Sequence, residues 1–95
     1  MKIKVYWIPT DGACREIEID NTLAAFQKAV GGYIETVTVT EDLVFIVNEE
    51  GLIHQLPLNR HLGSIRGDAL LVGVDGDEFR SLTQREINVA KRFVG

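Results

Sequence analysis

Five consecutive apolar residues, Leu43 to Val47, most strongly constrain how this chain can fold. An apolar run of strand length without polar alternation is typical of a central strand that is covered on both faces. The run ends at Asn48-Glu49-Glu50-Gly51, a segment with turn chemistry. A second apolar run, from Ala69 to Val74, predicts another such strand.

Shorter segments on either side of these runs also have strand patterns. Residues 2–7 alternate between polar and apolar, and Pro9-Thr10-Asp11-Gly12 is a turn that leads into a return strand at residues 14–19. The dipeptide Asp75-Gly76 predicts a second tight turn. The remaining predicted strands are 33–40, 52–56 (the return strand of another hairpin, stopped by Pro57) and 78–80.

Two apolar stripes at helical spacing predict two helices. The first helix is expected to be capped by Asp20 or Asn21 and to end at Gly31-Gly32. The second begins at a capping box formed by Thr83 and Glu86. The stripes consist of Leu23, Phe26 and Val30 in the first helix, and of Ile87, Ala90 and Phe93 in the second.

The predicted order of elements is β-β-α-β-β-(β)-loop-β-β-α over a single domain, residues 1–95. This order favours an α+β fold with a mixed or antiparallel sheet of about five to six strands, covered by two helices on one face. The opening ββαββ is β-grasp-like. Residues 57–67 are expected to be irregular, with one short helical turn near residues 58–62.

Charge and composition exclude several classes of protein. The net charge of −4 argues against general binding of nucleic acid through its phosphates. No apolar run approaches the roughly 20 residues needed to span a bilayer. The single cysteine, Cys14, excludes a disulfide framework. We therefore expect a cytoplasmic protein with no membrane contact.

No motif of a known catalytic class is present, and we expect no enzymatic activity, no metal and no cofactor. The two histidines, His54 and His61, are seven residues apart, a spacing that does not place them on one helix face as metal ligands. Cys14 fits a buried thiol better than a nucleophile. A small hydrolase that uses Glu49, Glu50 and His54 is the enzymatic alternative.

Two loop segments carry most of the candidate binding residues. The turn at residues 48–51 offers an amide and two carboxylates, and the long loop that follows residue 56 offers amide and guanidinium groups. An exposed tyrosine can stack on a base. The candidate ligand-binding residues are Tyr33, Asn48, Glu50, Asn59, Arg60 and Arg66. A structural role is the open alternative for each: Asn59 would satisfy loop backbone, and Arg60 would pair with a surface carboxylate.

Four segments together resemble one family: Val30-Gly31-Gly32-Tyr33-Ile34-Glu35, Asn48-Glu49-Glu50-Gly51, Leu56-Pro57-Leu58-Asn59-Arg60 and Gly67 to Asp75. The pattern is similar to the family catalogued as domain of unknown function 3846, from the first strand to Leu82. This resemblance implies a small cytoplasmic protein expressed from a bacterial phage or mobile element. It carries over no catalytic residues, and it marks Asn48, Glu50, Asn59 and Arg60 only as recurrent positions.

In that setting we expect a non-enzymatic binding protein. One hypothesis is a counter-defence protein that sequesters a nucleotide-type immune signal, with arginines for the phosphates and a homo-oligomer that builds the pocket. The alternative is an interaction module that binds and inhibits a host or phage protein through a sheet edge or the acidic surface.

Overall fold

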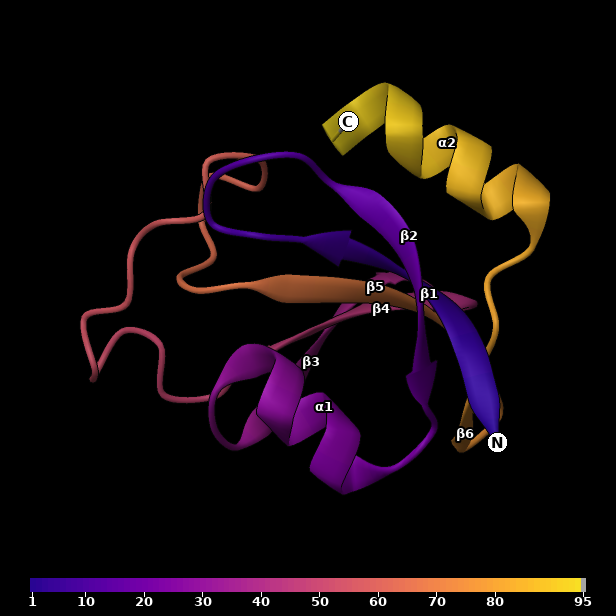
Figure 1. Cartoon of the computed structure of the whole chain (residues 1–95), viewed down its shortest axis with the longest axis horizontal. Helices are drawn as coiled ribbons and strands as arrows, with labels where there is room; N and C mark the ends of the chain where they lie inside the picture. The colour runs from indigo at the N-terminus through magenta and orange to yellow at the C-terminus, as the bar shows by residue number, and fades with distance from the viewer. Residues whose placement is uncertain (95) are drawn as a thin grey trace.

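The computed structural model describes residues 1–94, which form six strands and two helices (Figure 1). The elements are β1 (Lys2–Ile8), β2 (Arg15–Asp20), α1 (Leu23–Val30), β3 (Ile34–Thr40), β4 (Leu43–Asn48), β5 (Ala69–Asp75), β6 (Glu78–Arg80) and α2 (Gln84–Val94). All strand pairs are antiparallel, in the order β2-β1-β5-β4-β3, and β6 pairs with β5. The predicted α+β class and the opening ββαββ order are confirmed.

The apolar run that dominates the sequence lies inside the sheet, as predicted. It forms β4, which pairs with β3 on one side and with β5 on the other. Phe45 is opposite Val37 of β3 and Leu71 of β5. In β5 the first five residues are all buried. These two strands form the centre of the sheet because their side chains lose contact with water on both faces.

The two helices cover opposite faces of the sheet, as Figure 1 shows, so the expectation that they share one face is wrong. Successive residues of a strand point to opposite faces, and β5 therefore supplies side chains to two cores. The core under α1 includes Phe26, Val30, Leu70 and Val72. The core under α2 includes Ala69, Leu71, Ile87 and Ala90.

The first helix begins one residue later than predicted. Thr22 is its N-cap, and the Thr22 hydroxyl accepts a hydrogen bond of 3.2 Å from the backbone N–H of Ala25. The side chain of Asn21 instead donates to the backbone oxygen of Phe79. Gly31 ends the helix with a φ of 81°, as expected for a left-handed C-terminal cap. The predicted stripe member Leu23 is exposed.

The second helix has the predicted capping box. Thr83 N–H donates to Glu86 Oε1 (2.8 Å), and Glu86 N–H donates to the Thr83 hydroxyl (3.2 Å). Arg80 also donates to Glu86 (2.9 Å), and this hydrogen bond lowers the pKa of the Glu86 carboxyl. Phe93 was expected in the buried stripe but is 81% exposed. The end of α2 stands over a hollow of about 170 Å³ and does not pack on the sheet there.

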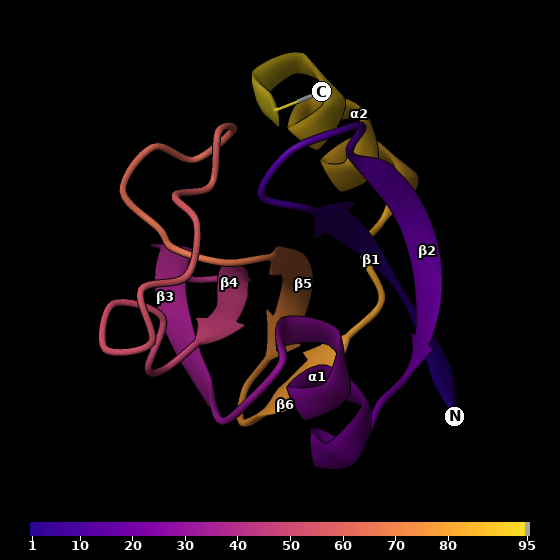
Figure 2. The same cartoon turned by 60° about the vertical axis from the view of Figure 1, so that its left-hand side comes forward.

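The predicted return strand at residues 52–56 does not form. Both edges of β4 are already paired, so a hairpin partner for β4 has no place in the sheet. The chain makes a series of turns there, closed by His54 N–H to Glu50 O (2.9 Å) and Leu56 N–H to Gly51 O (2.9 Å). The irregular segment between β4 and β5 lies beside β3 and β4 at one end of the sheet (Figure 2). We call this segment, residues 49–68, the long loop.

Candidate functional site

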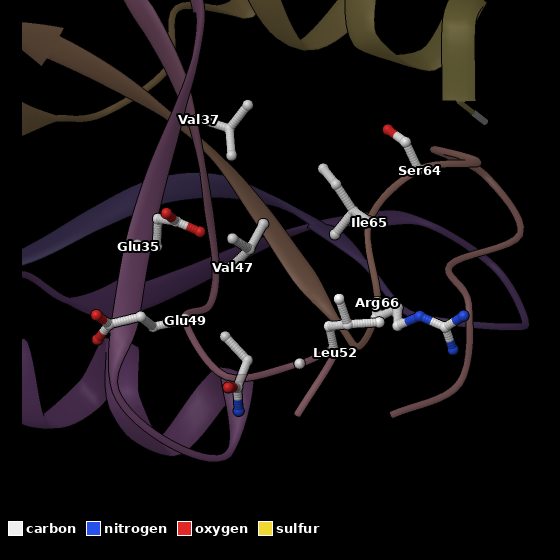
Figure 3. Close-up of a pocket in the computed structure, with 10 residues that line it drawn as sticks. Glu35, Val37, Val47, Glu49, Leu52, Ser64, Ile65 and Arg66 are labelled. Atoms are coloured by element: carbon white, nitrogen blue, oxygen red, sulfur yellow. The ribbon is translucent and has the colours of Figure 1, made fainter. Parts of the chain in front are cut away.

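The turn at residues 48–51 and the end of the long loop, residues 64–66, meet over one face of the sheet. They enclose, with β3 and β4, an open hollow of about 360 Å³, which we call the loop hollow (Figure 3). Residues 56–63, the other loop segment singled out in the sequence, do not line this hollow. Its lining consists of Glu35 and Val37 from β3, Val47 and Asn48 from β4, and Glu49, Gly51, Leu52, Ser64, Ile65 and Arg66 from the long loop. The turn after β4 and the end of the long loop therefore form one site.

Gly51 allows the two parts of the long loop to approach closely. A Cβ atom at this position would lie 2.8 Å from the backbone oxygen of Arg66, which is closer than van der Waals contact permits. Gly51 is buried at this contact. Gly51 therefore belongs to the turn and also permits the close contact with Arg66 that forms one wall of the loop hollow.

Asn48 is nearly buried, and both ends of its amide are used within the chain. Its Nδ2 donates to the backbone oxygen of Val30 at the end of α1 (3.1 Å). Its Oδ1 accepts from the backbone N–H of Glu50 (2.8 Å). Gly32 packs so closely on this amide that a Cβ there would lie 2.9 Å from Nδ2. Asn48 therefore joins α1 to the start of the long loop, and this is a structural role.

Asn59 is fully buried, and the chain itself satisfies its amide. Its Nδ2 donates to the backbone oxygens of Ile8 and Gly67, both at 3.1 Å. Its Oδ1 accepts from the backbone N–H groups of His61 (3.0 Å) and Leu62 (3.2 Å). With 0% of its surface exposed, Asn59 presents no group to a ligand. The structure gives it the alternative role, the satisfaction of loop backbone.

Three other candidate residues lie outside the lining of the loop hollow. Arg60 is exposed and lies 3.7 Å from the carboxylate of Asp11. Tyr33 is exposed just before β3. Glu50 Oε1 lies 3.6 Å from Nε2 of His54 within the turns of the long loop. Only two of the six predicted residues line the hollow, and one of these is the structural Asn48.

We expect Arg60→Ala to change the free energy of unfolding by less than about 0.5 kcal/mol, because exposed ion pairs contribute little. Both side chains of the pair between Arg60 and Asp11 are about three-quarters exposed. Urea denaturation of the variant and the wild type measures the difference. A loss of several kcal/mol would show that Arg60 holds the long loop in place.

The charges around the loop hollow do not favour a phosphate group. Arg66 is its one cationic side chain, and its guanidinium donates to the backbone oxygen of Leu56 (3.2 Å). In Figure 3 the guanidinium of Arg66 and the carboxylate of Glu49 point away from the hollow on opposite sides, while the carboxylate of Glu35 is directed toward it. A carboxylate that faces the hollow repels an anionic ligand, and the distant guanidinium does not offset this repulsion. The floor is apolar, formed by Val37, Val47, Leu52 and Ile65.

The side chains considered for catalysis from the sequence lie outside this hollow, except Glu49, which lines it. Among residues 1–94, no three His, Cys, Asp or Glu side chains lie close enough together to hold a metal ion. Burial raises the pKa of the Cys14 thiol, which disfavours the nucleophilic thiolate. His61 is anchored by a contact of 2.8 Å between its Nε2 and the backbone oxygen of Gly12. Glu50 and His54 are an acidic and a basic group that lie 3.6 Å apart, but neither of them lines the hollow.

Sequence reasoning missed the most unusual feature beside the hollow. Leu52 and Ile53 are 73% and 75% exposed, and Leu58 further along the long loop is also exposed. The strand predicted at residues 52–56 concealed the exposure of Leu52 and Ile53. The available signal was the placement of two adjacent large apolar residues directly after a polar turn, in a segment without apolar neighbours at strand spacing.

A family model described as "Domain of unknown function (DUF3846)" matches residues 1–94. The chain belongs to this family. The match extends the resemblance noted above through α2 and covers residues 1–94, the part of the chain that the structure describes. Comparison with curated proteins and with solved structures gives no match. No helix of the DUF3846 chain, within residues 1–94, is long and apolar enough to cross a membrane.

Proposed function

We propose that this DUF3846 protein is a non-enzymatic binding module that acts by holding another protein. The contact surface consists of the loop hollow together with Leu52 and Ile53. In the expected setting of a phage or mobile element, the partner is a host or phage protein in the bacterial cytoplasm, and binding inhibits it. The observation that carries the proposal is the exposure of Leu52 and Ile53 beside a hollow with an apolar floor.

Exposed large apolar side chains that cluster beside a concave surface are typical of protein interaction sites. Leu52 supplies both a wall of the loop hollow and an exposed surface, so the two features are continuous. The hydrogen bonds of Asn48 and Asn59 hold the two ends of the long loop. A surface that is held in place before binding loses less conformational entropy when the partner arrives, which supports affinity.

The charges favour a protein over the nucleotide-type signal considered from the sequence. The two arginines proposed for phosphate binding do not share a site, because Arg60 pairs with Asp11 and Arg66 lines the loop hollow. Glu35 and Glu49 stand at the same hollow. An apolar floor with carboxylates beside it suits a partner surface that carries apolar anchors and a basic rim.

Site-specific photo-crosslinking tests this proposal. A benzophenone amino acid in place of Ile53 should crosslink one protein in cells that express the chain. The same amino acid in place of Val89, an exposed apolar residue of α2, is the matched control and should not crosslink that protein. Leu52→Asp, added to the Ile53 probe, should reduce the crosslinked product at least tenfold.

Two results would count against the proposal. Equal crosslinking from positions 53 and 89 would show non-specific contact. Recovery of the chain from the same cells with a stoichiometric nucleotide, seen by native mass spectrometry, and without any crosslinked protein would favour nucleotide sequestration instead.

A further inference from the structure

The two outer strands of the sheet, β2 and β3, differ sharply in charge. β2 carries a charged side chain at four of its six positions, Arg15, Glu16, Glu18 and Asp20. β3 has the sequence Ile-Glu-Thr-Val-Thr-Val-Thr, with one charge in seven residues. Charged residues and prolines protect edge strands from pairing with other chains. The edge at β2 has such protection along its length, whereas β3 has one charge, no proline and a single register shift between Thr38 and Thr40.

The outer edge of β3 is also open. β3 is at the end of the strand order, opposite β2, and within residues 1–94 it pairs only with β4 (Figure 2). Every residue of β3 after Ile34 is exposed, on both faces of the sheet. Neither α1 nor α2 covers residues 35–40, which stay exposed although the long loop lies beside Glu35 and Val37.

The hydrogen-bond pattern shows which backbone groups face outward. The backbone N–H of Glu49 donates to the oxygen of Tyr33 (2.8 Å), which makes these two residues a hydrogen-bonded pair across the strands. Such pairs alternate along an antiparallel ladder, so Glu35 and Val37 also bond toward β4. The outer edge of β3 therefore presents the backbone N–H and C=O groups of Ile34, Thr36 and Thr38. Each of these groups needs a hydrogen-bond partner.

We propose that a second copy of the chain pairs with this edge, β3 against β3, and that the two sheets become continuous. In an antiparallel arrangement centred on Val37, Thr36 bonds to the partner's Thr38, and Val37 faces the partner's Val37. This register uses the outward groups of Thr36 and Thr38 in both strands, on the regular side of the register shift between Thr38 and Thr40. It also places Glu35 opposite the partner's Val39, whereas a register centred on Glu35 would put two carboxylates face to face.

The dimer joins the two loop hollows. The twofold axis of this dimer passes between the two Val37 residues, perpendicular to the sheet. Both copies therefore present the same face of their sheets on the same side of the dimer. Glu35 and Val37 line the hollow in each copy. The second copy therefore continues each hollow across the axis and presents two binding surfaces side by side. A partner with two anchors would gain from effective concentration. This goes beyond the proposed function, because single-copy binding does not need it.

Light scattering coupled to size-exclusion chromatography tests the assembly with the full chain. The wild type should have twice the 10.6 kDa mass of one chain at micromolar concentration. Val37→Lys should shift it to a single chain, because two lysines would meet at the axis. Val89→Lys makes the same charge change at a comparably exposed site on α2 and should remain dimeric. Circular dichroism verifies that both variants are folded. A monomeric wild type, or a dimeric Val37→Lys variant, would overturn the proposal.

Cysteine crosslinking tests the register. In a Cys14→Ser background, Val37→Cys should form a disulfide-linked dimer on mild oxidation, since facing residues in such a pair have Cα atoms about 4.5 Å apart. Val39→Cys lies roughly 13 Å from its own counterpart in this register and should not crosslink. Crosslinking of Val39→Cys alone would contradict the register. The variant with Leu52→Asp and Ile53→Asp should stay dimeric, so failure of the dimer and failure of partner binding give different results.

Discussion

Phe26→Ala should lower the free energy of unfolding by about 3–5 kcal/mol, the range for deletion of a buried aromatic side chain. Phe26 is 1% exposed and is one of two residues, with Val30, that α1 buries in the core against the sheet. Its ring meets the ring of Phe79 edge to face, with centroids 5.2 Å apart and an angle of 85°. Truncation removes this contact and leaves a cavity between α1 and the central strands. Urea denaturation followed by circular dichroism measures the loss.

Leu23→Ala is the matched control for this variant, because it removes an apolar side chain from the same short helix. Leu23 was part of the predicted stripe but is 57% exposed, so its loss should cost less than about 1 kcal/mol. Equal losses for Phe26→Ala and Leu23→Ala would mean that helix propensity, and not burial, determines how α1 contributes to stability.

Asn59→Ala should cost a similar amount, about 3–5 kcal/mol, although it removes no apolar core residue. Four backbone groups lose their partner in this variant: the oxygens of Ile8 and Gly67, and the N–H groups of His61 and Leu62. Each buried group without a partner carries a desolvation cost of about 1–3 kcal/mol, reduced where water enters. Thermal and urea denaturation should both show the loss.

Two variants isolate the reason for this effect. Arg60→Ala changes the next residue and should leave stability nearly unchanged. Asn59→Asp keeps the acceptor for the N–H groups of His61 and Leu62 but places a carboxylate against two carbonyl oxygens. Its stability should therefore approach that of the wild type as the pH falls and the carboxyl becomes protonated. A stable Asn59→Ala variant would return Asn59 to the list of ligand-binding candidates.

Local patterns in the sequence predicted the elements that depend on local chemistry. The run from Leu43 to Val47 became the interior strand β4, and the capping box of Thr83 and Glu86 became the start of α2. Gly31 ended α1 as expected. Each of these features is determined by residues within a few positions of one another, so a single sequence contains the information.

Features that depend on distant segments were not predictable in the same way. The strand expected at residues 52–56 failed because β5, more than twenty residues later in the chain, pairs with the free edge of β4. A helical stripe predicts which residues are buried, but not which face of the sheet buries them, and both helices were expected on one face for this reason. Asn59 was ambiguous because one of its partners, the oxygen of Ile8, is 51 residues away.

The candidate site was predicted only in part. The turn at residues 48–51 lies at the hollow, but residues 56–63 do not line it, and Asn48 and Asn59 serve the loop itself. The proposed contact depends instead on Leu52 and Ile53, which polar motifs do not reveal. A sequence pattern can mark such apolar residues, but only the structure shows whether they are exposed or buried.

Isothermal titration of the purified partner, identified by crosslinking, tests the central claim most directly. The wild type should bind one partner per hollow, and the variant with Leu52→Asp and Ile53→Asp should bind on the order of 100-fold more weakly while retaining its fold. Unchanged affinity in that variant would contradict the proposed contact surface. Turnover of a substrate by the purified chain, lost in Glu50→Gln, would contradict the claim that it acts by binding alone.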